Sequence, residues 1–437
     1  MADLKHIART IFRRTLAAID IPAAFERKLA RSGASIACGD DRFDLSRFER
    51  IRAVAIGKAA VAMARGLAGA LAPDFRAEGI LVAPQLPAEP VPGFRGIAAG
   101  HPVPNAGSFQ AGRAILDLLS GCDRFTLVFF LLSGGGSSLV ELPLDPGVSL
   151  ADAQTLYRAL VTCGASIEEI NVVRKHVSAV KGGRLAAAAS EATKITLGIS
   201  DVPVGRESAL ASGPTLPDPS TVADAGRIVR DYGLAEKMPA SLAKSFAPGG
   251  NLPETPKPGD PAFRRAHFAL VLGLHDLTHP AHCAAEAEGC VTICDNSTDD
   301  WPVARAADHL LGQLARLRSE NPGRRVAVIA DGELSSPVTG DGIGGRNSAF
   351  VLDCVAKIAG QPIAVLSAGT DGIDGSSPAA GAVADGATLE RARSLGFDPH
   401  DFARRSDSYS FFKAVGDAIE TGPTGNNLRD LRILIAE

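Results

Sequence analysis

Residues 126–138 read TLVFFLLSGGGSS, an apolar run that stops at three glycines between serines. A continuous apolar run of this length is typical of a parallel strand that is covered on both faces. Glycines directly after the run let backbone N–H groups approach an anion, because no Cβ atom stands in the way. The stretch therefore predicts a buried strand whose carboxyl end forms an anion-binding loop.

The rest of the first half alternates short apolar runs with stretches of helical periodicity. Strands are expected at Val54–Ile56, Gly79–Val82, Leu127–Leu132 and Thr196–Ile199, and helices at Ala59–Ala70, Ser108–Leu119, Ala151–Leu160 and Val172–Ala189. Strands that alternate with helices form a parallel sheet with crossover connections. The sequence therefore predicts a Rossmann-like, doubly wound α/β domain.

A proline-rich segment between Phe246 and Pro261 marks a change of domain. Prolines among glycines and polar residues are typical of a linker. We expect two α/β domains, a larger one over residues 1–250 and a smaller one over residues 260–437. The final Leu431–Ile435 could be an edge strand of either domain. In the second domain we expect strands at Ala269–Leu272, Val291–Ile293, Val326–Ile329 and Ile363–Leu366, and helices at Val303–Leu317 and Ser348–Ile358.

Composition and charge exclude several classes of partner. The chain has 437 residues and a formal net charge of −4. Without a block of Lys and Arg it suits neither nucleic acid nor a membrane surface, and no window reaches the roughly 18 apolar residues of a membrane span. The seven cysteines are an odd, scattered set, which is typical of a reducing cytoplasm and not of a disulfide framework. Small molecules are the expected partners, and a homodimer stays open.

The glycine-rich loop departs from two known motifs at one residue. Leu139 stands where a dinucleotide-binding G-x-G-x-x-G fingerprint requires its third glycine. It also replaces the last glycine of a G-x-S-x-G nucleophile elbow around Ser137. A phosphate cradle and a simple tight turn are the two interpretations that remain.

Two cations stand at the starts of expected helices. Lys58 follows a strand and a glycine, where a mobile positive charge attracts phosphate. The segment is not a Walker A loop, because Ala59 replaces the Ser or Thr that would hold Mg²⁺. Arg346 follows the glycines of residues 340–345, and its guanidinium suits carboxylate or phosphate oxygens. For Lys58 a solvated side chain is the alternative.

Several carboxylates follow expected strands. Asp201, Glu333, Asp371 and Asp374 each stand near the carboxyl end of a strand, where a carboxylate can take a proton or hold Mg²⁺. Together they predict a Mg²⁺ site between the two domains, with Asp371 favoured over Asp374. Helix capping and turn formation are the alternatives, because aspartate serves both routinely.

A group of histidines and cysteines between residues 275 and 294 raises the question of zinc. His275 and His279 are four residues apart, a spacing that can share a metal on a helix. No C-x-x-C pair accompanies them, so a zinc site is not expected.

Nine segments together resemble the glycerate 2-kinase family, the class II glycerate kinases with a C-terminal MOFRL domain. They follow one another in order over nearly the whole chain. The segments are Ala55–Ala60, Gly100–Pro104, Leu132–Ser138, Asn171–His176, Lys181–Leu185, Ser200–Val202, Ser212–Thr215, Gly344–Asn347 and Ala368–Gly372.

The resemblance implies transfer of the ATP γ-phosphoryl group to the 2-hydroxyl of D-glycerate, with Mg²⁺, in a cleft between the domains. Lys58 and Arg346 would be the catalytic cations, and Asp201 would activate the acceptor hydroxyl or hold Mg²⁺. His275-Asp276 departs from the small or amide-bearing loop expected there. The phosphate- and substrate-binding residues would be Ser133, Gly134, Gly135, Gly136, Ser137, Ser138, Asn347 and Thr370, and the metal ligands Asp371, Glu333 and Asp201.

Two other functions compete with this one. Relatives of the family have been labelled hydroxypyruvate reductases, but an NAD(P)-dependent enzyme would need a fingerprint after the first strand, and the sequence has none. A sensor that binds a sugar phosphate would also use anion loops, but it would not account for the carboxylates at strand ends.

Overall fold

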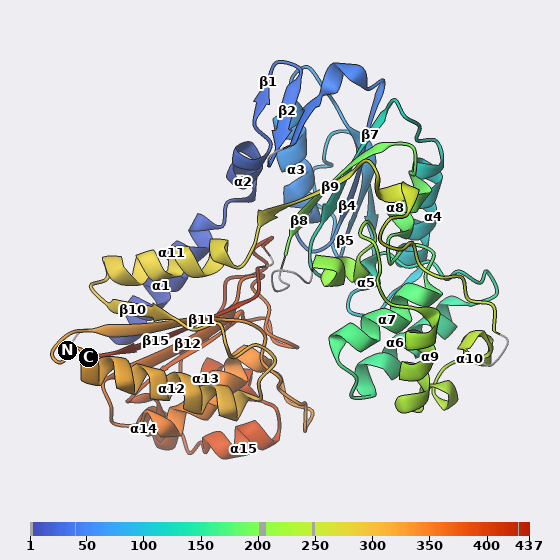
Figure 1. Ribbon diagram of the computed structural model, residues 1–437. Helices are drawn as coiled ribbons and strands as arrows, with labels where there is room; N and C mark the ends of the chain where they lie inside the picture. Colours follow the sequence, from blue (N-terminus) through green and yellow to red (C-terminus); the bar gives the residue numbers. More distant parts are fainter. Residues whose placement is uncertain (1–2, 40, 201–206, 247–249, 427) are drawn as a thin grey trace. The chain divides into compact units, whose positions relative to one another are not determined.

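The computed structural model describes residues 3–39, 41–200, 207–246, 250–426 and 428–437. The chain divides into two compact units (Figure 1): one comprises Ile21–Leu272, and the other comprises Met1–Asp20 with Gly273–Glu437. We call them the first and the second unit. Each contains one six-stranded sheet with helices, so the predicted α/β class with two domains is confirmed.

The sheet of the first unit is parallel throughout. Its strand order is β6-β5-β4-β7-β8-β9, so the order reverses between β4 and β7. The predicted doubly wound sheet is confirmed, and in such sheets ligands bind beyond the carboxyl ends of the strands at this switch point. The strands are β4 (Arg50–Ile56), β5 (Glu78–Ala83), β6 (Phe94–Ala98), β7 (Thr126–Leu132), β8 (Thr193–Ile199) and β9 (Ala266–Leu272).

Strand β7 is the apolar run that the sequence places in the core. All seven of its residues are buried, because β4 and β8 flank it and helices cover the sheet. Val128, Phe130 and Leu132 pack with Ile115 and Leu119 of α4 (Ala106–Ser120). The burial on both faces explains why the strand carries no alternation of polar and apolar residues.

Helices and a small antiparallel sheet complete the first unit. Helices α6, α7 and α9 bury apolar faces against one another in a cluster of their own. The elements are α2 (Ile21–Lys28), β1 (Arg31–Ser32), β2 (Ser35–Cys38), β3 (Asp41–Asp44), α3 (Ala60–Leu71), α5 (Gly136–Leu139), α6 (Leu150–Thr162), α7 (Ile167–Val177), α8 (Arg184–Ala188), α9 (Val222–Asp231) and α10 (Ala240–Phe246).

The helix predicted over Val172–Ala189 is divided in the structure. Helix α7 ends at Val177 and α8 begins at Arg184. Between them Gly182 and Gly183 have φ values of +54° and +82°, a backbone conformation that glycine adopts readily and a helix cannot contain. Two adjacent glycines inside a helical pattern were the signal for this break.

The second unit has a mixed sheet of order β10-β11-β15-β12-β13-β14. Its strands are β10 (Val291–Cys294), β11 (Val326–Asp331), β12 (Ile363–Gly369), β13 (Gly381–Asp385), β14 (Ala418–Ile419) and β15 (Asp430–Ala436). The last strand, β15, lies antiparallel between β11 and β12. It is therefore central, although the sequence analysis expected an edge strand, and all seven of its residues are buried.

The units differ from the predicted domains at both boundaries. Strand β9, expected in the second domain, pairs with β8 at the edge of the first sheet, so the division falls after Leu272 instead of near residue 250. Helix α1 (Leu4–Ala18) belongs to the second unit, because Ile7, Ile11 and Phe12 bury its apolar side. Its Lys5 pairs with Asp417 at 2.8 Å.

Six further helices of the second unit pack around its sheet. They are α11 (His275–Ala287), α12 (Val303–Glu320), α13 (Arg346–Lys357), α14 (Thr388–Ser394), α15 (Pro399–Arg404) and α16 (Ser408–Ala414). Among the described residues of both units, no helix has the length and apolar character needed to cross a membrane.

Candidate functional site

The loops after β4 and β7 meet at the switch point of the first sheet. The backbone N–H of Ser133 donates to the carbonyl of Ile56 at 2.9 Å, and the N–H of Lys58 donates to the carbonyl of Gly134 at 3.0 Å. The N–H of Ala59 donates to Ser133 Oγ at 3.1 Å. The structure thus brings the predicted lysine and the predicted glycine-rich loop side by side.

Glycine is required where these loops touch. A Cβ atom on Gly57, whose φ is +128°, would lie 2.1 Å from Ser133 Oγ. Gly135 has a φ of +85°, and its Cβ position lies 3.0 Å from His101 Cδ2 and 3.4 Å from Lys58 Cγ. Gly135, Lys58 and His101 therefore border the same small space. His101 was not predicted as a site residue, although Gly100-His101-Pro102 lies just after β6.

The three serines of the loop have different surroundings. Ser133 is fully buried and its Oγ is engaged by Ala59. Ser138 is 4% exposed, and its hydroxyl donates to the carbonyl of Gly135 at 3.3 Å. Ser137 is only partly buried, and its Oγ lies 2.7 Å from Ser212 Oγ. Of the three, Ser137 is the one whose side chain can reach a ligand.

A buried carboxylate holds the segment behind this loop. Glu141 is 4% exposed and accepts hydrogen bonds from Lys181 Nζ at 2.7 Å and from Ser178 Oγ at 2.6 Å. The Tyr157 hydroxyl lies 2.6 Å from Glu141 Oε2 and 2.7 Å from the Ser137 carbonyl. Burial, and then the charge of Glu141, raise the pKa of Tyr157 well above its usual value. A complete set of polar partners makes this support rigid.

Asp201, the predicted base or metal ligand of the first unit, lies outside the described residues. The chain is described again from Glu207 onward, where Ala211 and Ser212 have φ values of +51° and +60°. Two consecutive non-glycine residues in this conformation are uncommon, and such strain concentrates at functional sites.

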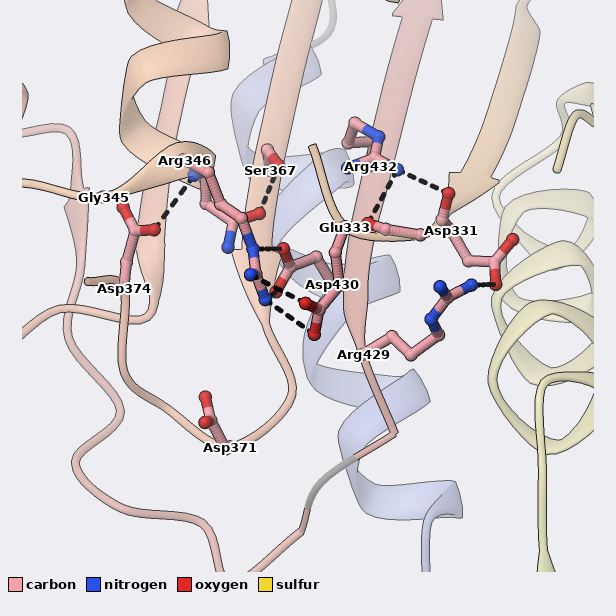
Figure 2. Close-up of polar contacts among 12 residues, drawn as sticks. Asp331, Glu333, Gly345, Arg346, Ser367, Asp371, Asp374, Arg429, Asp430 and Arg432 are labelled. Carbon is pink, nitrogen blue, oxygen red and sulfur yellow. Dashed lines mark hydrogen bonds and ion pairs between the residues drawn. The ribbon is translucent and has the colours of Figure 1, made fainter. Parts of the chain in front are cut away.

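In the second unit, three strand ends bring acidic residues to one edge of the sheet. Asp331 ends β11 opposite Leu431, and Asp430 begins β15 opposite Gly369 of β12. Arg346, the first residue of α13, reaches this edge and contacts Asp430 Oδ2 through Nε at 2.5 Å. Its Nη1 contacts Glu333 Oε2 at 2.8 Å, as Figure 2 shows.

The arginine is therefore held by carboxylates on two sides. Burial disfavours its charge, but Asp430 and Glu333 outweigh this and raise the pKa of Arg346 above its usual value. The guanidinium stays positive and oriented. Asp430 was missed by the sequence analysis, because nothing in the chain near it points to a partner 84 residues away.

The buried Asp374 carboxylate caps the amino end of α13. Its carboxylate accepts from the N–H groups of Asn347 at 2.9 Å and Ser348 at 2.8 Å, and from Ser348 Oγ at 2.5 Å. The amide oxygen of Asn347 accepts from Ser367 Oγ at 2.6 Å. Burial raises the pKa of Asp374 to about 6 despite these bonds. The helix end thus carries a carboxylate of the protein itself.

The other predicted residues of this unit lie beside the same edge. Thr370 is 1% exposed; its hydroxyl donates to the Arg429 carbonyl at 2.8 Å and accepts from the Leu428 N–H at 2.8 Å. Asp371 is partly exposed, and its Oδ1 accepts from the Ile373 N–H at 3.0 Å. Their roles as phosphate and metal ligands stay predictions.

A second acid–arginine cluster, which the sequence analysis missed, borders β11. Arg429 Nη2 contacts Asp299 Oδ2 at 2.5 Å, and its Nη1 lies 3.5 Å from Asp331 Oδ2. Arg432, 1% exposed, donates to the Gly332 carbonyl at 2.9 Å. Burial raises the pKa of Asp331. These contacts fix the Asp331-Gly332-Glu333 segment that positions one partner of Arg346.

The described carboxylates do not by themselves form a complete metal site. Within the described ranges, no three His, Cys, Asp or Glu side chains are placed to hold a metal ion. The rings of His275 and His279 stack on each other at 5.1 Å. Mg²⁺ is commonly held by one or two carboxylates together with substrate phosphates, and this mode fits the carboxylates at the sheet edge.

The fold and these contacts define a class of protein. It has a doubly wound α/β unit that presents a lysine and a glycine-rich loop at its switch point, and a second α/β unit that presents an oriented arginine among carboxylates. Both arrangements are typical of proteins that handle phosphorylated or carboxylated small molecules.

Comparisons with known proteins give the family. Residues 7–247 match a model described as a domain of unknown function, DUF4147, and residues 326–430 match the MOFRL family. The D-glycerate 2-kinase of Thermotoga maritima is 37% identical over 88% of this chain and 90% of its own. A protein of Agrobacterium vitis named putative hydroxypyruvate reductase is 39% identical over 87% of this chain and 86% of its own.

A solved structure agrees over the whole chain. The crystal structure of glycerate kinase from Thermotoga maritima superimposes with a TM-score of 0.82 at 34% identity and covers 99% of both chains. The chain belongs to the glycerate 2-kinase family, with a DUF4147 domain followed by a MOFRL domain. The resemblance seen in the sequence is thereby confirmed.

The close contact between the two loops predicts that Gly57→Ala strongly destabilises the protein. The added Cβ would force Ser133 away from the end of β4, at a position where a positive φ also strains any side chain. We expect a loss of about 2–4 kcal/mol in the free energy of unfolding, measured by urea denaturation. Gly69→Ala is the matched control, because Gly69 lies in α3 with open space around it and the change should stabilise the helix by about 0.5–1 kcal/mol. Equal effects of the two variants would contradict the close contact.

The buried carboxyl of Asp374 predicts a pH dependence of stability. Its pKa in the folded state, about 6, is above the ordinary value of 3.8, so the folded protein binds the proton more tightly than the unfolded chain. The contribution is present at low pH and is lost as the pH rises from about 4 through 6, by about 1.4 kcal/mol per unit of pKa shift. The free energy of unfolding of the wild type, relative to Asp374→Asn, should fall over this range in urea titrations. A relative stability that rises instead would show that the helix end holds the carboxylate ionised.

Proposed function

We propose that the protein transfers the γ-phosphoryl group of ATP to the 2-hydroxyl of D-glycerate, giving 2-phosphoglycerate and ADP. The contact of Lys58 with the glycine-rich loop at the switch point is the observation that carries this proposal. Phosphoryl transfer needs positioned reactants and neutralised oxygen charge, with little covalent work by the protein. The kinase names of the relatives agree with it.

The residues of the first unit would act on the phosphoryl oxygens. Among the described residues, the N–H groups of Gly134 and Gly135 have no hydrogen-bond acceptor, and Lys58 lies against the same loop. We infer that these groups donate to the transferring phosphoryl group and neutralise its charge. Asp201 is proposed to activate the 2-hydroxyl of the acceptor or to hold the metal.

The second unit would supply a fixed positive charge and metal ligands. Arg346 is oriented by Glu333 and Asp430, so its fork needs no reorganisation when it meets a substrate oxygen anion. Mg²⁺, when bound with ATP, would neutralise the charge of the phosphates. Asp371, Glu333 and Asp201 are the carboxylates proposed to hold it.

An NAD(P)-dependent hydroxypyruvate reductase is the second candidate, because one relative carries that name. The first strand of the sheet, β4, leads into Gly57-Lys58-Ala59 and not into a dinucleotide fingerprint, and Leu139 occupies the third glycine position after β7. ADP and phosphoglycerate formation from ATP, Mg²⁺ and D-glycerate tests the kinase. NADH oxidation with hydroxypyruvate tests the reductase. ADP release that does not depend on glycerate would contradict the proposal.

Lys58→Ala tests the role of the cation in the transferring step. Loss of one charge contact made in the transition state costs about 2–4 kcal/mol, so we expect kcat to fall roughly 10²–10³-fold. The thermal unfolding temperature should stay close to that of the wild type. Lys237→Ala, which removes an exposed lysine of the same unit, is the control and should keep full activity. A Lys58→Ala enzyme with normal kcat would remove Lys58 from the mechanism.

A further inference from the structure

Arg174 is a buried cation for which the described part of the chain supplies no ionic partner. Its side chain on α7 is 8% exposed, and its guanidinium carbon lies 4.4 Å from the centre of the Tyr157 ring. Among the described residues, no carboxylate forms an ion pair with it, and its Nε has no hydrogen-bond acceptor. Arginine is almost never this deeply buried without a partner, because removing a charge from water is costly.

Two neighbouring buried lysines each have a carboxylate partner. Lys175 contacts Asp218 at 3.2 Å, and Lys181 contacts Glu141 at 2.7 Å. Both lysines are as deeply buried as Arg174, and both have a carboxylate within reach. Arg174 therefore differs from both of these lysines, which have a carboxylate partner.

Two chains of contacts place Arg174 beside the glycine-rich loop. Asn171 lies one helical turn before it on the same face of α7, and its amide oxygen accepts from Ser212 Oγ at 2.8 Å. Ser212 Oγ in turn lies 2.7 Å from Ser137 Oγ. On the other side, the Tyr157 ring that stacks with Arg174 carries the hydroxyl that lies 2.7 Å from the Ser137 carbonyl.

The first chain of contacts also fixes the direction of the Ser137 hydroxyl. Ser212 has one hydroxyl proton and donates it to Asn171, so in the contact between the serines Ser137 donates and Ser212 accepts. The remaining capacity of Ser137 Oγ is to accept a hydrogen bond. A ligand with its own hydroxyl would therefore suit Ser137 Oγ.

A hydroxy acid carries both an anion for Arg174 and a hydrogen-bond donor for Ser137. Its carboxylate matches the planar fork of an arginine, and its hydroxyl can donate to Ser137. We propose that Arg174 binds the carboxylate of the hydroxy-acid substrate beside Ser137. The inference rests on the proposed function and names, within that site, the residue that recognises the acid. An ATP phosphate is the competing anion, since arginine binds both.

Steady-state kinetics of Arg174→Gln and Arg174→Lys separate the two anions. Loss of a charged hydrogen-bonded contact predicts a KM for D-glycerate raised roughly 10–100-fold in Arg174→Gln, with an intermediate effect in Arg174→Lys. The KM for ATP should change less than twofold. Arg158→Gln is the matched control, because Arg158 lies exposed beside Tyr157 on α6, and both of its KM values should be those of the wild type. A raised KM for ATP with an unchanged KM for glycerate would overturn the carboxylate assignment.

Binding without ATP tests the same residue independently of catalysis. D-glycerate should raise the thermal unfolding temperature of the wild type, and glyceramide, which lacks the carboxylate charge, should raise it much less. Arg174→Gln should lose this difference. A glycerate-induced shift that persists unchanged in Arg174→Gln contradicts the inference. Wild-type protein that binds glycerate but forms no glycerate-dependent ADP contradicts only the proposed kinase activity.

The ligand-free unfolding temperature distinguishes binding from a structural role. A residue that holds the fold together lowers this temperature when it is replaced. An unpaired buried charge costs stability, so Arg174→Gln without ligand should unfold at the wild-type temperature or above it. A fall of more than about 5 °C, with unchanged KM values in Arg174→Lys, would assign Arg174 a structural role.

Discussion

The meeting of β4 and β7 is the constraint on which the first unit depends. Past the last paired residues of the strands, the N–H of Ser133 still bonds to Ile56, and the N–H of Lys58 bonds to Gly134. These backbone bonds hold the Lys58 backbone against the glycine-rich loop before any ligand arrives. Groups that are fixed in advance need no ordering when charge develops, which is how a preorganised site stabilises a transition state. The glycines at positions 57 and 135 are what allow the approach.

The fold was predictable where local pattern and burial agree. The apolar run of β7 and the alternation of strands and helices sufficed for the parallel sheet, because a strand covered on both faces has a recognisable composition. The position of β15 was not predictable: an apolar segment at the end of a chain carries no information about which two strands it joins. Helix α1 shows the same limit. Its apolar face predicts that the helix packs against another element, but not that this element is α11, β12 or β15.

The candidate site likewise contains some residues that the sequence predicts and some that it does not. Lys58, the glycine-rich loop and Arg346 could be found from sequence, because each follows a strand or opens a helix, where ligand-binding groups gather. Asp430 and Arg174 could not. The importance of Asp430 comes from its contact with Arg346, and that of Arg174 from the absence of such a contact among the described residues. Both facts belong to the packed structure. The serines of the loop look alike in sequence, and only burial separates Ser137 from Ser133 and Ser138.

The buried cations of the two units differ in whether the described residues supply them with a carboxylate partner. Arg346 has two carboxylate partners, and Lys181 has one, so the fold itself supplies counter-charges for both cations. Within the described ranges, the contact recorded for the Arg174 guanidinium is with the face of an aromatic ring. Such a contact contributes about 0.5–2 kcal/mol, less than the several kcal/mol that burial of an ion costs. Proteins keep an energetically unfavourable arrangement of this kind where function requires it. Beside a loop at the switch point of a parallel sheet, the function that offsets the cost is the binding of an anion.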